Sequence, residues 1–163
     1  MKNTDRFLIG IIAGVVLLVI VAFAITLTRP QPTYQAEDTP EGVAHNYLLA
    51  LQKKEYGRAY GYLSPAIEGY PPSEIKFVEA TMDDRWRFRG DVEVTLAVES
   101  VTVTGERAVV QVRESSFRGG NLFDSSQSSI LFEMVLRRTD EGWRIFDSEY
   151  YFAWCWKTVD GCK

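Results

Sequence analysis

Residues 92–112 read VEVTLAVESVTVTGERAVVQV, and this stretch decides the fold class. Apolar and polar residues alternate along it, which predicts β-strands with one buried face. The alternation changes parity near Glu99-Ser100, and a one-residue slip within a strand predicts a β-bulge that bends the sheet. Thr104-Gly105-Glu106 then predicts a tight turn into a returning strand. The stretch therefore indicates a bent antiparallel sheet.

The residues after this hairpin continue the sheet. Arg118-Gly119-Gly120-Asn121 predicts a loop, and Asp140-Glu141-Gly142 predicts a tight turn. Trp143 and Ile145 begin the final strand after that turn. The strand between the loop and the turn has these apolar residues on one face: Ile130, Phe132, Met134 and Leu136.

Upstream of the sheet the apolar residues follow a helical period. Thr39-Pro40-Glu41 predicts a helix start, because Thr can cap the helix, Pro suits the first position and Glu favours the positive end of the dipole. Ser64-Pro65 ends a second helix. The apolar stripes of these two helices are Val43, Tyr47, Leu48 and Leu51, and then Tyr56, Ala59, Tyr60 and Leu63.

A third helix is predicted from a Ser73 cap through Asp84. Its apolar face would contain Ile75, Val78 and Met82. About three helices followed by about four antiparallel strands predict an α+β fold. A strongly bent sheet wrapped around helices makes a cone with an open mouth.

The N-terminal segment at residues 7–28 reads FLIGIIAGVVLLVIVAFAITLT and contains no charge. As a helix it would span ~33 Å, against roughly 30 Å of hydrocarbon in a bilayer. Lys2 and Arg6 precede it and only Arg29 lies close behind it, which favours a cytoplasmic N-terminus and a domain outside the cell membrane. The alternative is a signal peptide, because Ala22-Phe23-Ala24 resembles a cleavage site after Ala24.

Gly10 and Gly14 form a GxxxG pattern in this segment. The pattern can let two membrane helices approach closely, although glycine is common in membrane helices that do not pair. Residues 29–38 contain two prolines and are predicted to be an extended linker. The chain thus divides into a cytoplasmic N-terminus at 1–6, a transmembrane helix at 7–28, a linker at 29–38, a domain at 39–150 and an aromatic tail at 151–163.

The tail contains the only two cysteines, Cys155 and Cys162. Both follow the domain on the side that we expect to be oxidising, so a disulfide is the natural prediction, with free thiols as the alternative. The tail also contains Tyr150, Tyr151, Phe152, Trp154 and Trp156. These aromatic residues are expected to pack in the core, or else to form a contact surface for a ligand, a partner or the membrane interface.

Charge and composition argue against several functions. The chain has a net charge of −4, and without residues 1–29 it has 15 basic and 21 acidic residues, or −6. An acidic domain is a poor candidate for nucleic-acid binding. One histidine, His45, and two distant cysteines do not make a structural zinc site. The sequence contains no phosphate-binding glycine motif and no Ser-His-Asp set, so we predict no metal and no cofactor.

Arg85-Trp86-Arg87-Phe88-Arg89 is unusual. As a strand it would place Arg85, Arg87 and Arg89 on one face and the two aromatic residues on the other. The arginines would then be candidates to contact an anion, such as a phospholipid head group. The alternative is a solvated face, neutralised by nearby acids, whose aromatic side packs into the core.

The pattern TPEGVAHNYLLALQKKEYGRAYGYLSP at 39–65, together with DEGWRIFDSE at 140–149, resembles the NTF2-like (cystatin-like) superfamily. It looks most like the domains that bacteria hold outside the cytoplasmic membrane behind one helix or a lipid anchor. The resemblance covers roughly residues 39–150 and implies the fold. It says little about function, because this fold contains enzymes, scaffolds and binding modules.

Some enzymes of this fold use a buried carboxylate as a base at the mouth of the cone. The acids that could be considered are Asp83, Asp84, Asp91 and Asp147. Asp83 and Asp84 are equally well explained as members of exposed charge pairs. No local motif identifies a catalytic residue of the family in this chain. We therefore assign no catalytic residue.

Three functions follow. The first is a membrane-anchored extracytoplasmic module that binds a small apolar ligand or an envelope protein, with a pocket lined by Tyr60, Trp86, Phe132 and Trp143. The second is an assembly component of a cell-envelope complex, which predicts an exposed apolar patch and self-association. The third, and least favoured, is an isomerase or lyase of the ketosteroid-isomerase type, which needs a carboxylate with a raised pKa inside the cone.

Overall fold

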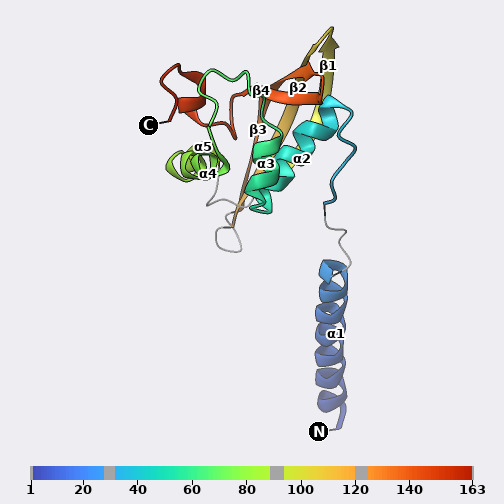
Figure 1. Cartoon of the computed structure of the whole chain (residues 1–163). Coiled ribbons are helices and arrows are strands. Elements are labelled where there is room, and N and C mark those ends of the chain that lie inside the picture. The colour runs from blue at the N-terminus through green and yellow to red at the C-terminus, as the bar shows by residue number, and fades with distance from the viewer. Residues whose placement is uncertain (1, 28–31, 89–93, 120–124, 163) are drawn as a thin grey trace. The chain divides into compact units, whose positions relative to one another are not determined.

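The computed structural model describes residues 2–27, 32–88, 94–119 and 125–162, and the chain divides into two compact units, Met1–Pro32 and Thr33–Lys163. The first unit contains the helix α1 (Lys2–Leu27) (Figure 1). Its stretch Phe7–Ile25 is long and apolar enough to cross a membrane, by length and composition alone. A signal sequence has the same properties, so the helix leaves both readings of the N-terminus open.

The second unit contains one antiparallel sheet in the strand order β1-β2-β3-β4. The predicted meander of four strands is therefore confirmed. Its strands are β1 (Val94–Thr104), β2 (Arg107–Gly119), β3 (Ser125–Thr139) and β4 (Gly142–Ser148). We call the side of the sheet that carries the buried residues Ala108, Val110 and Val112 its inner face.

Local sequence signals determine the bends and turns of the sheet. The pairing register of β1 with β2 shifts between Val98 and Ser100, where the parity change predicted a bulge. Gly105 and Gly142 occupy the predicted turns with positive φ angles of 59° and 111°, a conformation that glycine adopts without a side-chain clash. A second register shift, between Val135 and Leu136, was not predicted.

The helices start where capping residues predicted. Thr39 accepts a hydrogen bond from Gly42 N at 3.1 Å, and Ser73 accepts one from Lys76 N at 3.3 Å. The second helix is shorter than predicted, because residues 62–64 leave it and pair with the free edge of β4 instead. The helical elements of this unit are α2 (Pro40–Gln52), α3 (Tyr56–Gly61), α4 (Glu74–Asp83), α5 (Arg85–Phe88) and the 3₁₀ helix η1 (Trp154–Lys157).

The buried face of α4 is only partly the one that the sequence predicted: Val78 packs against the core, but the two other predicted residues do not. Ile75 and Met82 are 70% and 43% exposed, whereas Phe77 is fully buried. The reason is a tertiary contact: the Phe77 ring stacks on Trp156 of η1, with 5.2 Å between ring centroids, and also packs against Tyr60. The apolar spacing of α4 is compatible with either face, and the aromatic contact selects one.

The tail and part of the linker belong to the folded unit. Tyr151, Phe152 and Trp156 are buried in the same core as the sheet, as expected for the aromatic residues of the tail. At the other end, the buried Asn46 side chain accepts a hydrogen bond from Gln35 N at 2.7 Å and donates one to Gln35 O at 2.9 Å. The compact unit therefore begins at Thr33, ahead of the predicted start at Thr39.

The assignment of the α4 face is testable with two substitutions on one helix. Phe77→Ala should destabilise residues 33–163 by about 3–5 kcal/mol, because it removes a buried aromatic ring and leaves a cavity. Ile75→Ala should change stability by less than about 0.5 kcal/mol, because the side chain is exposed. Urea unfolding followed by tryptophan fluorescence measures both. Equal losses for the two variants, or a larger loss for Ile75→Ala, would contradict the observed packing.

Candidate functional site

A buried carboxylate lies on the inner face of the sheet. Glu114 follows Ala108, Val110 and Val112 at alternate positions of β2 and is only 2% exposed. Its neighbours across the strands are Leu96 and Ile130, which are apolar. A carboxyl group in such surroundings costs free energy unless it is hydrogen-bonded. Tyr151 meets that need, because its hydroxyl donates a hydrogen bond to Glu114 Oε2 at 2.8 Å.

Contacts from two other elements hold Tyr151 in place. Its backbone has a positive φ of 57°, which is uncommon for a residue with a side chain. The hydroxyl of the buried Tyr47 on α2 donates to its carbonyl oxygen at 2.5 Å. The Phe132 ring of β3 lies 5.7 Å from the Tyr151 ring. The Glu114–Tyr151 pair is thus a preorganised donor and acceptor set inside an apolar core.

Sequence reasoning missed Glu114, although a signal was present. The residue continues the parity of Ala108, Val110 and Val112, so an acid stood at a position that the alternation assigns to the core. Such an acid is a functional-site candidate because burial and hydrogen bonding tune carboxyl groups for proton transfer or for ligand recognition. A structural role in specifying the packing of the core fits the same geometry.

Three of the four residues that were predicted to line a pocket belong to the core or pack against it, and the fourth lies outside it. Phe132 and Trp143 are buried in the core, and of the four Phe132 is the one that contacts Tyr151. Tyr60 is partly buried, and its hydroxyl donates to Pro71 O at 3.0 Å. Trp86 is 65% exposed, so it lies on the outside of the unit.

The acids that the sequence offered take part in ion pairs or lie on the surface. Asp84 accepts a hydrogen bond from Trp154 N at 3.0 Å and lies 3.6 Å from the Arg87 guanidinium. Asp147 pairs with Lys157. Asp83 is exposed at the end of α4. Asp91 lies outside the described residues.

The arginine-rich segment forms a short helix, α5, where the sequence suggested a strand. Arg85 is exposed, and Arg89 lies outside the described residues. Arg87 is largely buried and donates a hydrogen bond to Glu149 O at 2.9 Å, which fixes it to the chain that follows β4. The predicted common face of three arginines is therefore not seen in the described part of the segment. The turn at Asp84, which accepts the N–H groups of residues 87 and 88, favours the helix.

The Arg87 guanidinium lies 4.8 Å from the Trp86 ring and 5.3 Å from the Trp154 ring. This cluster joins α5 to the C-terminal segment, which lies beside α4 and α5 in Figure 1. Trp154 is 60% exposed. Together with Ile75 and Met82, which lie about two turns apart on α4, these tryptophans leave large apolar side chains in solvent. These exposed residues come from α4, α5 and the C-terminal segment, and we call the set the outer apolar surface: Ile75, Met82, Trp86 and Trp154.

The predicted disulfide between Cys155 and Cys162 is present. It closes the chain around η1, where Gly69 N donates a hydrogen bond to Trp156 O at 3.0 Å. A Cβ atom at Gly69 would lie 2.2 Å from Cys155 O, so only glycine permits this approach. The disulfide therefore stabilises the segment that carries Trp154 and Trp156.

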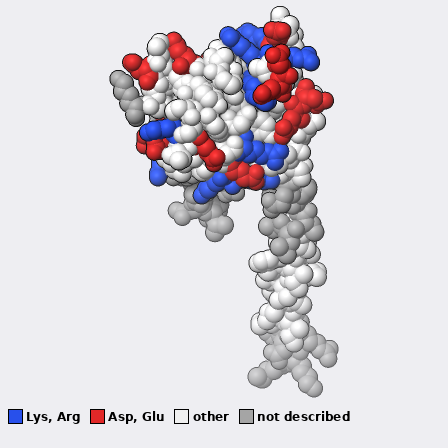
Figure 2. Space-filling model, in the orientation of Figure 1, with Lys and Arg blue, Asp and Glu red and all other residues white. Residues whose placement is uncertain are grey.

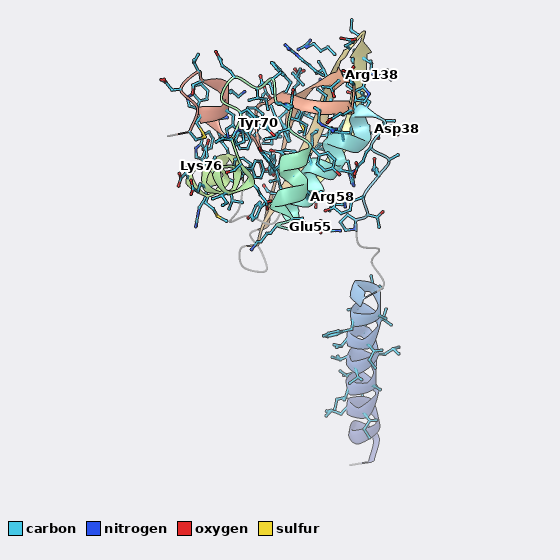
Figure 3. All side chains as sticks on the ribbon, viewed as in Figure 1. Asp38, Glu55, Arg58, Tyr70, Lys76 and Arg138 are labelled. Atoms are coloured by element: carbon cyan, nitrogen blue, oxygen red, sulfur yellow. A yellow bond between two sulfur atoms is a disulfide. The ribbon has the colours of Figure 1, made fainter. Side chains whose placement is uncertain are left out.

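A polar cluster attaches residues 33–38 to α3. Glu37 accepts hydrogen bonds from the Tyr62 hydroxyl at 2.6 Å and from Arg58 at 3.0 Å, and Figure 3 labels Arg58 on this side. The Tyr62 hydrogen bond, followed by the Arg58 contact, lowers the pKa of the Glu37 carboxyl. Burial and a hydrogen bond to Glu55 raise the pKa of Tyr34 to about 12. Within the described residues, no group of three or more His, Cys, Asp or Glu side chains could hold a metal ion.

No protein-family model and no curated protein matches this chain. Solved structures match it at the level of the fold. A protein from Thiobacillus denitrificans assigned as a calcium/calmodulin-dependent protein kinase type II association domain is 16% identical, with a TM-score of 0.50 over 72% of this chain and 95% of that chain. An NTF2-like protein with a cystatin-like fold from Novosphingobium aromaticivorans is 16% identical, with a TM-score of 0.47 over 66% of this chain and 75% of that chain.

A protein from Shewanella frigidimarina assigned as a ketosteroid isomerase is 20% identical, with a TM-score of 0.48 over 69% of this chain and 95% of that chain. The second unit thus shares its fold with the Thiobacillus denitrificans protein, and its α+β order is the one that the sequence predicted. At these identities the likeness concerns the fold and does not extend to an activity.

The contribution of the buried pair is testable with a tyrosine substitution. Tyr151→Phe removes the hydroxyl that donates to Glu114 and should destabilise the unit by about 1–3 kcal/mol, the cost of taking a hydrogen bond from a buried polar group. Tyr56→Phe is the matched control, because its hydroxyl makes no hydrogen bond in the described part of the chain. Urea unfolding of both variants measures the difference. A loss at Tyr151 no larger than the loss at Tyr56 would refute the role of the pair.

Proposed function

We propose that this chain is a single-pass membrane protein whose NTF2-like domain acts outside the cytoplasm as an interaction module. One observation carries the proposal: the only two cysteines, Cys155 and Cys162, are joined in a domain that follows an apolar helix. Structural disulfides persist in oxidising compartments and are rare in the cytosol. The basic residues Lys2 and Arg6 before the helix favour the same topology.

The arrangement of side chains favours the outer surface over an interior pocket as the place of interaction. Aromatic side chains of the chain itself fill the described core, including Tyr47, Phe132, Tyr151 and Trp156. The outer apolar surface instead exposes two tryptophans on either side of Arg87. Tryptophan and arginine are the residues that most often dominate binding energy at protein interfaces. In this proposal the Glu114–Tyr151 pair specifies the core, and no catalytic residue is assigned.

A second candidate function is an assembly component of a cell-envelope complex. The outer apolar surface supports it, because exposed apolar patches of this kind mark contact sites. Gly10 and Gly14 support it too, since a Cβ at either residue would have no atom within 4 Å apart from those of its chain neighbours and of the adjacent helix backbone. Two copies of α1 could pack closely at these glycines. The two candidate functions differ in whether the domain binds a different molecule or another copy of this chain.

Location is tested by expressing the full chain with a C-terminal tag. It should sediment with membranes and remain there at alkaline pH, and its cysteines should react with a maleimide reagent only after reduction. Residues 33–163 kept in the cytosol should stay soluble, with both thiols reactive without reduction. A soluble product shortened after Ala24 would support the signal-peptide alternative. A membrane-bound full chain with freely reactive cysteines would contradict the extracytoplasmic location.

Self-association is tested by analytical ultracentrifugation of the full chain in detergent. The assembly candidate predicts an oligomer that Trp86→Ser with Trp154→Ser weakens by at least about tenfold, since 1.4 kcal/mol of lost contact corresponds to that factor. Val159→Ser is the matched control, because Val159 is also exposed but lies outside the outer apolar surface. A monomer across the accessible concentrations would exclude this candidate and leave the foreign partner.

A further inference from the structure

Three arginines lie directly opposite one another across three strands of the sheet. Arg107 of β2 pairs in register with Arg137 of β3, which pairs in turn with Arg144 of β4. Their neighbours Ala108, Leu136 and Ile145 are fully buried on the inner face. Because successive side chains of a strand point to opposite faces, the three arginines belong to the outer face. We call them the arginine row.

The chain neutralises the row unevenly. Arg144 pairs with Glu141 at 3.2 Å, donates a hydrogen bond to Trp143 O at 3.2 Å and interacts electrostatically with Glu37. Among the described residues, neither Arg107 nor Arg137 has an acidic oxygen within 4.0 Å. Like charges placed directly opposite across strands destabilise a sheet. A repulsive arrangement of this kind needs a compensating anion, or it remains a net cost.

The acidic groups near the row are Glu37, which interacts electrostatically with Arg144, and those of the adjacent turns. The turns at this end of the sheet carry Glu106, Asp140 and Glu141, and a fourth arginine, Arg138, adds to the basic side. Figure 2 shows basic and acidic side chains together at this end, and Figure 3 labels Arg138 there. These acids belong to the turns, and Glu106 directly precedes Arg107, the first residue of β2.

A cation–π contact orders the side chain of Arg137, one member of the arginine row. The Arg137 guanidinium lies 3.5 Å from the centroid of the Phe146 ring, which projects from β4 on the same face. Stacking on an aromatic ring fixes the plane of a guanidinium while its N–H groups stay free at the rim. The cost of ordering the side chain is then met before any anion binds.

We propose that Arg107, Arg137 and Arg144 form a binding site for a phosphate-type oxyanion on the outer face of the sheet. Opposed residues have Cβ atoms about 5 Å apart, so adjacent guanidinium groups can donate to one tetrahedral anion. Arginine is suited to this task because its planar fork matches phosphate oxygens in pairs. Binding neutralises the repulsion within the row. The anion is either free phosphate or the phosphate of a lipid head group.

The test uses residues 33–163, whose core contains no residue of the first unit and is therefore complete by itself. Inorganic phosphate is titrated into the labelled protein at constant ionic strength, with chloride as the reference, and NMR shifts are recorded. The site predicts saturable shifts at the amides of residues 107, 137 and 144. Arg137→Gln and Arg107→Gln should each weaken phosphate binding at least tenfold.

Arg113→Gln is the matched control, because Arg113 lies on β2 at the same parity as Arg107 but is paired with Glu99 at 2.7 Å. It removes the same charge from the same face and should change phosphate affinity by less than about twofold, since its own site is already neutralised. In low salt without phosphate, Arg137→Gln should keep or raise the thermal midpoint, which shows that the variant folds. Linear shifts, or equal weakening by Arg113→Gln, would overturn the proposal.

Vesicles distinguish the two sources of phosphate. Binding to phosphatidylglycerol vesicles over phosphatidylcholine vesicles, competed by phosphate and lost in Arg137→Gln, identifies a head group. Saturable phosphate binding without any preference for vesicles identifies a free oxyanion. Failure of both measurements refutes the site. It leaves the proposed location and the outer apolar surface unaffected, because those depend on other residues and other experiments.

Discussion

The packing of Trp156 is the contact on which the rest of the second unit depends. This side chain is fully buried, and its ring meets Phe77 of α4, Phe88 of α5 and Phe152 of its own segment. The C-terminal segment and the helices α4 and α5, which are distant from it in sequence, therefore share one aromatic cluster. Large aromatic side chains supply much of the burial energy of a core this size. The C-terminal segment is thus an integral part of the fold, and the disulfide beside Trp156 keeps it in place.

This contact also decides what the unit shows to its surroundings. Because Phe77 turns toward Trp156, Ile75 and Met82 of α4 turn outward. The same segment places Trp154 on the surface, where Asp84 accepts its backbone N–H and Arg87 lies against its ring. The outer apolar surface is therefore a geometric consequence of the way in which the core closes. The exposure of these apolar side chains does not reflect poor packing of the helix.

Local signals in the sequence predicted local structure well. The parity slip at Glu99-Ser100, the turn glycines and the Thr39 and Ser73 caps all act through a few neighbouring residues, and each prediction is confirmed. The buried face of α4 and the helical form of residues 85–88 depend on contacts with residues near 150, which spacing along the chain does not contain. For Glu114, the alternation along β2 indicated an inward side chain. Its partner Tyr151 could not be predicted from any local pattern, because the two residues are far apart in the sequence.

Charged and polar groups are stabilised differently on the two faces of the sheet, because the two faces differ in their exposure to water. On the inner face a single carboxyl group is surrounded by apolar side chains, so it must be satisfied by the protein itself, and Tyr151 does so through a backbone held in an uncommon conformation. On the outer face water screens the exposed Arg107 and Arg137, and Glu141 pairs with Arg144, so the fold tolerates the repulsion within the arginine row. A buried polar group has to be hydrogen-bonded within the folded chain, whereas an exposed charge can be neutralised by a ligand. The Glu114–Tyr151 pair therefore contributes to stability, whereas the arginine row can bind a ligand.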